Sequence, residues 1–433
     1  MEKAETIFAL ASARGRAGVA VIRVSGPLAF AATAHLAKVV PEPRKTSLRV
    51  LWNEDEPLDQ ALVIVFEKGA SFTGEDVAEF HLHGGVAVVK SVFSVLEKLD
   101  GLRLAEAGEF TRRALENDRL DLPQVEGLAD LIDAETETQR KQAFKVMQGN
   151  LSQRCEHWRQ NLIRAMALLE AVIDFADEDV PVDVRPEVIE LINSVLDDLI
   201  SEISGRKAAE RIRDGFEVAI VGRPNIGKST LLNAIAGRDV AITSEIAGTT
   251  RDVIEVRLDL EGLPVTMLDL AGIRESQDIV ENLGIDRALG RADMADIRVF
   301  LVEQLDEADK LGVARKDGDI VIVGKGDSSN FDGPKVSGIS GLGVDNLLKE
   351  ISSELSARVV GSSSLIRQRH MEAIEKSVEN ILSATTRLSD PDELGELIAA
   401  DLRFAISSLD SLIGRVDVEQ VLGEIFAGFC IGK

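Results

Sequence analysis

Residues 222–229, Gly-Arg-Pro-Asn-Ile-Gly-Lys-Ser, constrain this chain more than any other stretch of its sequence. They match the phosphate-loop pattern G-x-x-x-x-G-K-[ST], with an apolar run at 217–221 before them and helical spacing at 229–236 after them. A strand, a loop and a helix in that order direct backbone amides, a helix dipole and a lysine at one phosphate. An ordinary glycine-rich turn is the alternative, but it does not account for the motif and its context together. The pattern therefore predicts a nucleoside triphosphate site.

The triphosphate itself needs a cation and a metal ion. We expect Lys228 to neutralise the β- and γ-phosphates and Ser229 to coordinate Mg²⁺. Asp269 opens a D-x-x-G segment after a second apolar strand, where it would reach the metal through water. Thr250 would complete the Mg²⁺ shell, although a surface threonine that caps a turn is the alternative. The expected nucleotide contacts are Gly222, Asn225, Ile226, Gly227, Lys228, Ser229, Thr230, Ser244, Glu245, Ile246, Ala247, Gly248, Thr249, Thr250, Asp269, Leu270, Ala271, Gly272, Lys325, Asp327, Ser337 and Gly338.

The segment Gly324-Lys325-Gly326-Asp327 indicates which base is bound. Asp327 can accept hydrogen bonds from guanine N1–H and N2–H₂, which adenine cannot offer, and an unpaired buried carboxylate is costly. GTP specificity follows. The usual pattern is N-K-x-D, so Gly324 removes a side chain that steadies the loop, and we expect a weakened affinity. By position, Ser337-Gly338 would supply a backbone N–H to the guanine oxygen.

The residue that orients the attacking water is not evident from the motifs alone. Ras-like enzymes place a glutamine after the D-x-x-G glycine, and this chain has Ile273 there, which cannot do so. Glu281 is the nearest plausible carboxylate, with Arg251 and Arg274 as nearby cations. On spacing alone, a solvated surface position explains Glu281 at least as well.

Composition limits the other possibilities. The chain has 433 residues, 45% of them hydrophobic, and a formal net charge of −25. It is long enough for several globular domains, and its acidity disfavours broad nucleic-acid binding. The cysteines, Cys155 and Cys430, are too far apart to suggest a disulfide framework, so we expect a cytoplasmic protein. We expect no signal peptide and no membrane span, because basic-then-apolar leaders and uncharged runs of about 18 residues are missing from the sequence.

The order of apolar patterns predicts a multidomain chain of α/β and all-α parts. We place an N-terminal α+β domain at 1–118, with strands at 19–24 and 61–66 and a helix at 27–39. A helical domain begins at 119–210, is interrupted by a Ras-like phosphate-loop GTPase domain at 211–360, and resumes at 361–433. Within the inserted domain the expected strands are 217–221, 265–268, 297–302 and 320–323.

Taken together, these residues resemble the MnmE (TrmE) family of tRNA-modification GTPases over essentially the whole chain. The most specific marks lie outside the GTPase segment, above all the C-terminal Cys430-Ile431-Gly432-Lys433, which matches C-[ILV]-G-K. The other matching segments are 18–26, 71–76 with 83–85, 108–111 leading to 117–122, and 246–252.

The resemblance implies a tetrahydrofolate site and a potassium site. The N-terminal domain would dimerise and bind a 5-formyl- or 5,10-methylene-tetrahydrofolate derivative through Arg23, Glu79, Arg119 and Lys433, although the family commonly has lysine at position 119. Glu281 would activate water. GTPase domains of two subunits would meet across their nucleotides, and Leu270 stands where the family usually has threonine. The implied K⁺ ligands, in place of an arginine finger, are Asn225, Ser244, Ile246 and Thr249.

The resemblance also implies a partner and a reaction. MnmG (GidA), which holds FAD, would form a heterotetramer with this chain and supply most of the tRNA contact. The pair would add a carboxymethylaminomethyl or aminomethyl group at C5 of the wobble uridine, U34. Cys430 is either a nucleophile in that reaction or a small residue that packs a helix end. A regulatory GTPase of ribosome assembly, and a folate-dependent one-carbon transferase regulated by GTP, remain alternative functions.

Overall fold

The computed structural model describes residues 5–174, 184–242, 254–269, 290–359, 363, 365, 367–389, 395–416, 423, 425–426, 429 and 432. Contacts within the chain divide it into two compact units. The first comprises residues 1–129 and 410–433, and the second comprises residues 130–409. The C-terminal residues thus belong to the same unit as the N-terminal ones.

The first unit is built on a mixed sheet with the strand order β3-β4-β5-β2-β1-β6. Its neighbouring strands pair antiparallel, except for β1 and β6, which pair parallel. Alternation along the strands puts Phe8, Ile22 and Phe80 on one face, in a core shared with helices α1 and α2. The elements are β1 (Thr6–Leu10), β2 (Val19–Ser25), α1 (Ala29–Ala37), β3 (Ser47–Asn53), β4 (Glu56–Phe66), β5 (Val77–His83), α2 (Val86–Leu96), β6 (Leu102–Leu104) and α3 (Glu109–Glu116).

Helix α3 and the C-terminal segment complete the first unit. Phe110 of α3 packs against Ile7 and Ala9, on the sheet face opposite Phe8. Gly108, just before α3, has a φ of +67°, and a Cβ there would lie 2.7 Å from the Phe426 ring. A Cβ on Gly432 would lie 2.1 Å from the Leu10 carbonyl oxygen. Both positions therefore require glycine, because the C-terminal segment packs this closely on the N-terminal sheet.

The second unit contains a parallel sheet with the strand order β11-β10-β7-β9-β8. Strands β7, β9, β10 and β11 pair parallel, and β8 pairs antiparallel with β9 at the edge. The central strands are buried runs of valine, isoleucine and leucine, as expected for a sheet covered on both faces. The elements are β7 (Phe216–Val221), α9 (Lys228–Ala236), β8 (Ile254–Leu260), β9 (Leu263–Asp269), β10 (Ile297–Val302), the 3₁₀ helix η1 (Leu305–Lys310), β11 (Ile320–Val323) and α11 (Val344–Val359).

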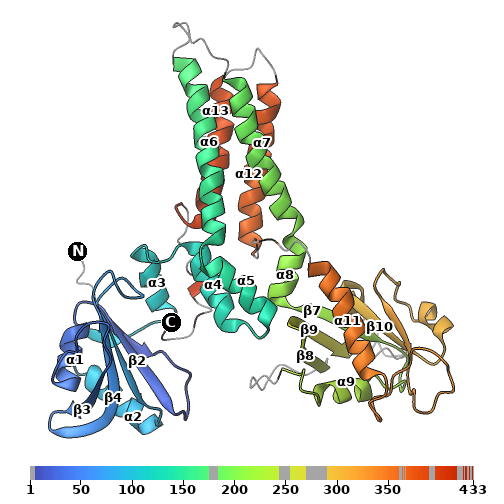
Figure 1. Ribbon diagram of the computed structural model, residues 1–433, viewed down its shortest axis with the longest axis horizontal. Helices are drawn as coiled ribbons and strands as arrows, with labels where there is room; N and C mark the ends of the chain where they lie inside the picture. The colour runs from blue at the N-terminus through green and yellow to red at the C-terminus, as the bar shows by residue number, and fades with distance from the viewer. Residues whose placement is uncertain are drawn as a thin grey trace, which may run out of the picture. The chain divides into compact units, whose positions relative to one another are not determined.

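Along the chain, the sheet domain lies between two groups of helices. Figure 1 shows α6, α7, α12 and α13 running alongside one another, with α7 in contact with both α6 and α12. The α/β and all-α fold class is confirmed. None of the helices in the described ranges is long and apolar enough to cross a membrane. The helices are α4 (Leu122–Asp133), α5 (Glu137–Met147), α6 (Asn150–Asp174), α7 (Arg185–Ser204), α8 (Arg206–Asp214), α12 (Gln368–Leu388) and α13 (Gly395–Ile413).

Candidate nucleotide-binding site

The phosphate loop joins β7 to α9 as a tight turn. Asn225 and Gly227 both have positive φ, +63° and +108°, and Gly227 is the N-cap of α9. A Cβ on Gly222 would lie 2.5 Å from the carbonyl oxygen of Leu301 in β10, so only glycine fits there. Left-handed residues in such a turn orient successive backbone N–H groups toward one point, which suits an anion.

Lys228 is buried within this loop. Its Nζ donates hydrogen bonds to the carbonyl oxygens of Gly222 at 2.8 Å and Arg223 at 3.2 Å. Burial lowers the pKa of Lys228, and the negative charge of Asp269 partly opposes this shift. Two carbonyl dipoles are weaker partners for an ammonium group than a phosphate oxygen is. The loop therefore holds a positive charge that a triphosphate can satisfy better than the protein does.

Ser229 and Asp269 lie together where a metal ion would bind. The Ser229 hydroxyl donates to Asp269 Oδ2 at 2.6 Å. Asp269 is 3% exposed, and its Oδ1 is buried with no hydrogen-bond partner among the described residues. A buried carboxylate oxygen left in this state is unfavourable. Hydroxyl and carboxylate oxygens are ligands that Mg²⁺ prefers, so this donor set fits a bound Mg²⁺.

A cavity of about 210 Å³ adjoins the phosphate loop on the side of β11. Lys325, Asp327, Ser337 and Gly338 line it, so the structure brings the expected base-reading residues to one place. A Cβ on Gly338 would lie 2.6 Å from backbone atoms of Thr230, which shows how closely this turn packs on α9. Further lining residues, all expected from the sequence, are Asn225, Ile226, Gly227 and Thr230.

Five further residues that line the cavity were not expected from the sequence: Leu231, Leu301, Ser328, Val336 and Ile339. Leu301 of β10 forms part of its wall, and Ile339 lies at its rim with 84% of its surface exposed. The signal for Ile339 in the sequence is its position directly after Ser337-Gly338. Several expected site residues lie outside the described residues: Ser244, Glu245, Ile246, Ala247, Gly248, Thr249, Thr250, Leu270, Ala271, Gly272, Glu281, Cys430 and Lys433.

The first unit holds a second group of expected site residues. Arg23 of β2 and Glu79 of β5 are cross-strand neighbours, and the Nε of Arg23 donates to Glu79 Oε1 at 2.9 Å. The Arg23 guanidinium lies 5.6 Å from the ring centroids of both Phe72 and Phe110. Cation–π contacts with these two rings favour this position of the guanidinium group. These phenylalanines belong to the segments 71–76 and 108–111, whose sequence pattern does not indicate this role.

Arg119 lies beside the same loop. Its side chain is exposed, and its Cγ would be 3.2 Å from a Cβ on Gly74, which has a φ of +77°. Gly74 belongs to the loop at 71–76 that also carries Phe72. Arg23 and Arg119 thus both border this loop, and the structure places two cations and two aromatic rings around one segment.

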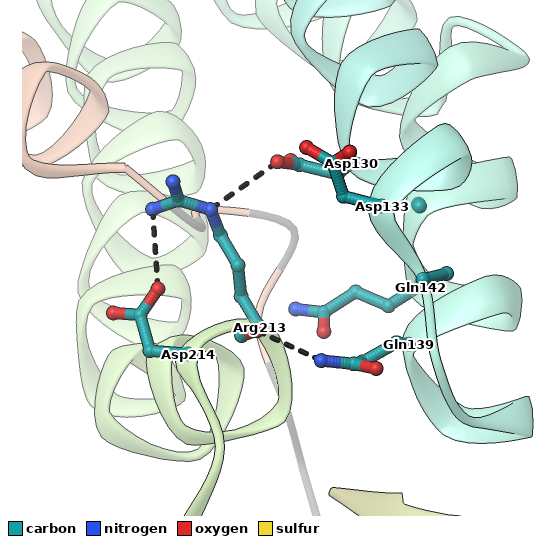
Figure 2. A pocket seen from close by; sticks show the side chains of 8 residues that line it. Asp130, Asp133, Gln139, Gln142, Arg213 and Asp214 are labelled. Atoms are coloured by element: carbon teal, nitrogen blue, oxygen red, sulfur yellow. Dashed lines mark hydrogen bonds and ion pairs between the residues drawn. The ribbon is translucent and has the colours of Figure 1, made fainter. Parts of the chain in front are cut away.

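A second cavity, of about 150 Å³, lies in the second unit between α4, α5 and α8. Figure 2 shows Arg213 directed at Asp130, with an Nε to Oδ1 distance of 3.3 Å, and the Gln139 amide donating to the Arg213 carbonyl oxygen. Arg367 Nη2 contacts the same Asp130 Oδ1 at 2.7 Å. Arg213 precedes β7 and Arg367 precedes α12. One carboxylate therefore joins the segments that lead into and out of the inserted sheet domain.

A parallel sheet whose first strand ends in a phosphate loop, with a hydroxyl–carboxylate pair and a cavity beside that loop, is the arrangement of a phosphate-loop GTPase, and the chain is a GTP hydrolase. Family models described as the TrmE N-terminus of a GTP-binding protein and the MnmE helical domain match residues 6–119 and 122–430. The chain belongs to the MnmE (TrmE) family.

Relatives named tRNA modification GTPase MnmE match along their whole length. One from Cereibacter sphaeroides (strain ATCC 17029) is 60% identical over 429 residues, covering 99% of this chain and 100% of the relative. One from Dinoroseobacter shibae is 55% identical and one from Ruegeria pomeroyi is 54% identical, each with the same coverage. Among solved structures, the G domain of the FeoB iron transporter of T. maritima is 22% identical with a TM-score of 0.25, covering 32% of this chain and 98% of that one.

Proposed function

We propose that this chain is a potassium-stimulated GTPase of tRNA wobble-uridine modification that acts in the cytoplasm. With the FAD-dependent partner MnmG it would add a carboxymethylaminomethyl or aminomethyl group at C5 of U34, using a one-carbon unit from tetrahydrofolate. The observation that carries the proposal is a phosphate loop with Ser229, Asp269 and a lined cavity beside it, in a chain 60% identical, over 99% of its length, to a protein named tRNA modification GTPase MnmE.

The geometry supports the roles proposed for Lys228, Ser229, Asp269 and Asp327. Lys228 exchanges its two carbonyl contacts for phosphate oxygens and neutralises their charge. Ser229 would hold Mg²⁺ and Asp269 would reach it through water, and the bound ion would stabilise the charge on the phosphates. Asp327 reads the guanine edge from inside the cavity. We assign water activation to Glu281. Potassium coordination is assigned to Asn225, Ser244, Ile246 and Thr249, of which Asn225 lies in the phosphate loop with a left-handed backbone.

The proposed folate site lies around Arg23. A folate tail carries carboxylates that Arg23 and Arg119 can bind, and Glu79 can accept hydrogen bonds from a pterin ring. Phe72 and Phe110 offer aromatic faces beside these groups. The contact between Gly432 and Leu10 supports a role for Cys430 and Lys433 here, because Leu10 pairs with Ile22, the neighbour of Arg23 on β2.

The proposed homodimer would use the sheet face that carries Arg23. Val19, Leu48 and Leu62 lie on that face and are 56%, 54% and 46% exposed, and Leu48 pairs with Leu62 across β3 and β4. Large apolar residues exposed next to one another favour burial against a second surface. A second copy of the chain on this face would adjoin the proposed folate site.

Mass analysis of tRNA nucleosides from a deletion strain tests the proposal. We expect the C5-modified wobble uridines to disappear and to return with the wild-type gene but not with Lys228→Ala. Immature ribosomal RNA alongside intact tRNA would instead support a role in ribosome assembly. Cys430→Ser should impair the modification while sparing GTP hydrolysis, and unchanged modification in that variant would remove the nucleophile interpretation.

A further inference from the structure

We propose that Leu301 is the positioning residue that holds the base-reading loop against the phosphate loop. Residue 324 cannot do this in the present chain, because it is a glycine and has no side chain. The inference rests on the proposed reading of guanine by Asp327. It concerns how the two loops are kept in register when the usual asparagine is replaced by Gly324.

Leu301 touches both loops. It lies near the end of β10, is 2% exposed, and lines the base cavity. Its carbonyl oxygen lies 2.5 Å from where a Cβ on Gly222 would be, at the start of the phosphate loop. Its side-chain Cγ and Cδ1 lie 3.1 and 3.2 Å from where a Cβ on Gly324 would be. The backbone of Leu301 thus meets one loop, and its side chain meets the other.

Gly324 is not required by its own backbone conformation. Its φ lies outside the left-handed region, where glycine would be needed. What restricts a side chain there is space, since the Leu301 side chain and the Ile226 carbonyl oxygen, at 3.1 Å, already border the position of the missing Cβ. Leu301 and Gly324 are therefore a complementary pair, a large residue that packs against a residue without a side chain.

The position of Gly324 determines the position of Asp327. The Gly324 N–H donates to the Val302 carbonyl oxygen at 2.9 Å, and Lys325 follows with a φ of +52°. The chain therefore turns sharply between the contact with Leu301 and the carboxylate that would read guanine. Removing the Leu301 side chain leaves the loop without this support, while the backbone and Lys228 contacts of the phosphate loop remain.

Equilibrium binding of GDP and of inosine diphosphate to the full chain, with Mg²⁺ and K⁺, measures this effect. Inosine keeps N1–H but lacks the 2-amino group that Asp327 would accept from, so the ratio of the two affinities reports the contact to that amino group. We expect Leu301→Ala to weaken GDP binding about tenfold and to reduce the preference for GDP. Leu301→Val, a smaller truncation, should shift both values less and in the same direction.

The matched control is Val299→Ala. Val299 is fully buried in the same strand and the same core cluster but does not line the base cavity. It should lower the melting temperature of the chain and leave the GDP to inosine diphosphate ratio unchanged. If Val299→Ala reduced that ratio as much as Leu301→Ala, the effect would be one of general stability, and the inference would be wrong.

Position 324 supplies the decisive variant. Gly324→Asn should weaken GDP binding in the native background, because its Cβ meets both the Leu301 side chain and the Ile226 carbonyl oxygen, and should weaken it less in the Leu301→Ala background, where the side-chain contact is removed. Additive effects, or tighter binding in the native background, would overturn the inference. A wild-type chain that binds ADP as well as GDP would defeat the proposed guanine site and this inference with it, whereas a guanine-selective chain with additive variants would defeat the inference alone.

Discussion

The Ser229 hydroxyl donates a hydrogen bond of 2.6 Å to Oδ2 of Asp269, which lies 40 residues further along the chain. This contact joins the first turn of α9 to the last residue of β9. The other oxygen of the carboxylate is buried and has no hydrogen-bond partner among the described residues. The two side chains thus bring together oxygen atoms of the kind that Mg²⁺ prefers.

Ser229→Ala should therefore impair metal-dependent chemistry more than nucleotide binding. The change removes one proposed Mg²⁺ ligand and leaves Asp269 Oδ2 without its hydroxyl donor. We expect single-turnover GTP hydrolysis to fall about a hundredfold, the scale seen when one group that stabilises transition-state charge is lost. Hydrolysis measured over a range of Mg²⁺ concentrations should also show a higher requirement for the metal.

The control for this variant is Ser328→Ala. Ser328 lines the base cavity, and its hydroxyl donates only to the Lys325 carbonyl oxygen. It should leave the Mg²⁺ dependence of hydrolysis unchanged. An unaltered Mg²⁺ requirement in Ser229→Ala itself would show that the serine is not a metal ligand.

Nucleotide binding should be linked to protonation of Lys228. Burial lowers the pKa of Lys228 in the nucleotide-free chain, and a bound phosphate would raise it again. Binding should therefore take up a proton at pH values between the lowered pKa and the ordinary lysine value of about 10.4. Calorimetric titrations with GDP in buffers of different ionisation enthalpy measure this uptake. Lys228→Arg should abolish it, because arginine stays protonated throughout this range.

The same shift has a consequence for stability. In that pH window the unfolded chain binds more protons at this lysine than the folded chain does. The free energy of unfolding of the nucleotide-free chain should therefore rise as the pH increases through the window. A fall at the same pH, absent from Lys228→Arg, would show that the lysine gains rather than loses affinity for its proton on folding.

Local patterns predicted the elements around the phosphate loop because a strand, a loop and a helix follow one another within twenty residues. The strands expected at 297–302 and 320–323 are confirmed to the residue, and the helix after the loop begins at Lys228, one residue earlier than expected. Strand β8 was not predicted. Its apolar residues alternate with Glu255, Arg257 and Asp259. This alternation is typical of an antiparallel edge strand with one face buried and the other exposed to solvent.

The residues that sequence reasoning missed act through distant contacts. Leu301 is one leucine in an apolar strand, and only its approach to Gly222 and Gly324 distinguishes it. Asp130 is one acidic residue of a helix, and its partners Arg213 and Arg367 are 83 and 237 residues away. No spacing rule connects positions so far apart. The motifs predicted which chemistry is present, and the packing that positions it required the fold.

Glu109 should make the first unit sensitive to acid. Its carboxylate is 1% exposed and accepts hydrogen bonds from Arg103, Arg113 and the Glu106 N–H. Burial alone would raise the pKa of Glu109, but these bonds outweigh it and hold the pKa at about 2. Because the folded pKa lies below the unfolded value of about 4.3, this stabilisation is complete above that pH and is lost as the pH falls toward 2.

Glu109→Gln should thus lower the free energy of unfolding of the first unit at neutral pH by about 3 kcal/mol, and the difference from wild type should shrink in acid. Trp52 fluorescence during urea unfolding reports this unit in a Trp158→Phe background, since the chain has two tryptophans. Glu42→Gln is the control. Glu42 pairs with Lys45 at the surface of the same unit, where solvent screens the charges, so no measurable change is expected. A difference that persists at pH 2 would contradict the assignment.

Asp130 should contribute to the stability of the second unit without contributing to nucleotide affinity. Its Oδ1 is contacted by Arg213, at the end of α8, and by Arg367, at the start of α12 (Figure 2 shows the first contact). Asp130→Ala removes the carboxylate from both guanidinium groups and should cost about 1–3 kcal/mol of unfolding free energy. Asp133→Ala, at an exposed residue that lines the same cavity, should cost much less.

Trp158 fluorescence during urea unfolding, with and without saturating GDP, separates the effect on stability from the effect on nucleotide affinity. The stabilisation by GDP should be equal in wild type and both variants, because Asp130 lies outside the phosphate and base contacts. A smaller GDP effect in Asp130→Ala would instead show that this carboxylate supports the nucleotide site through β7.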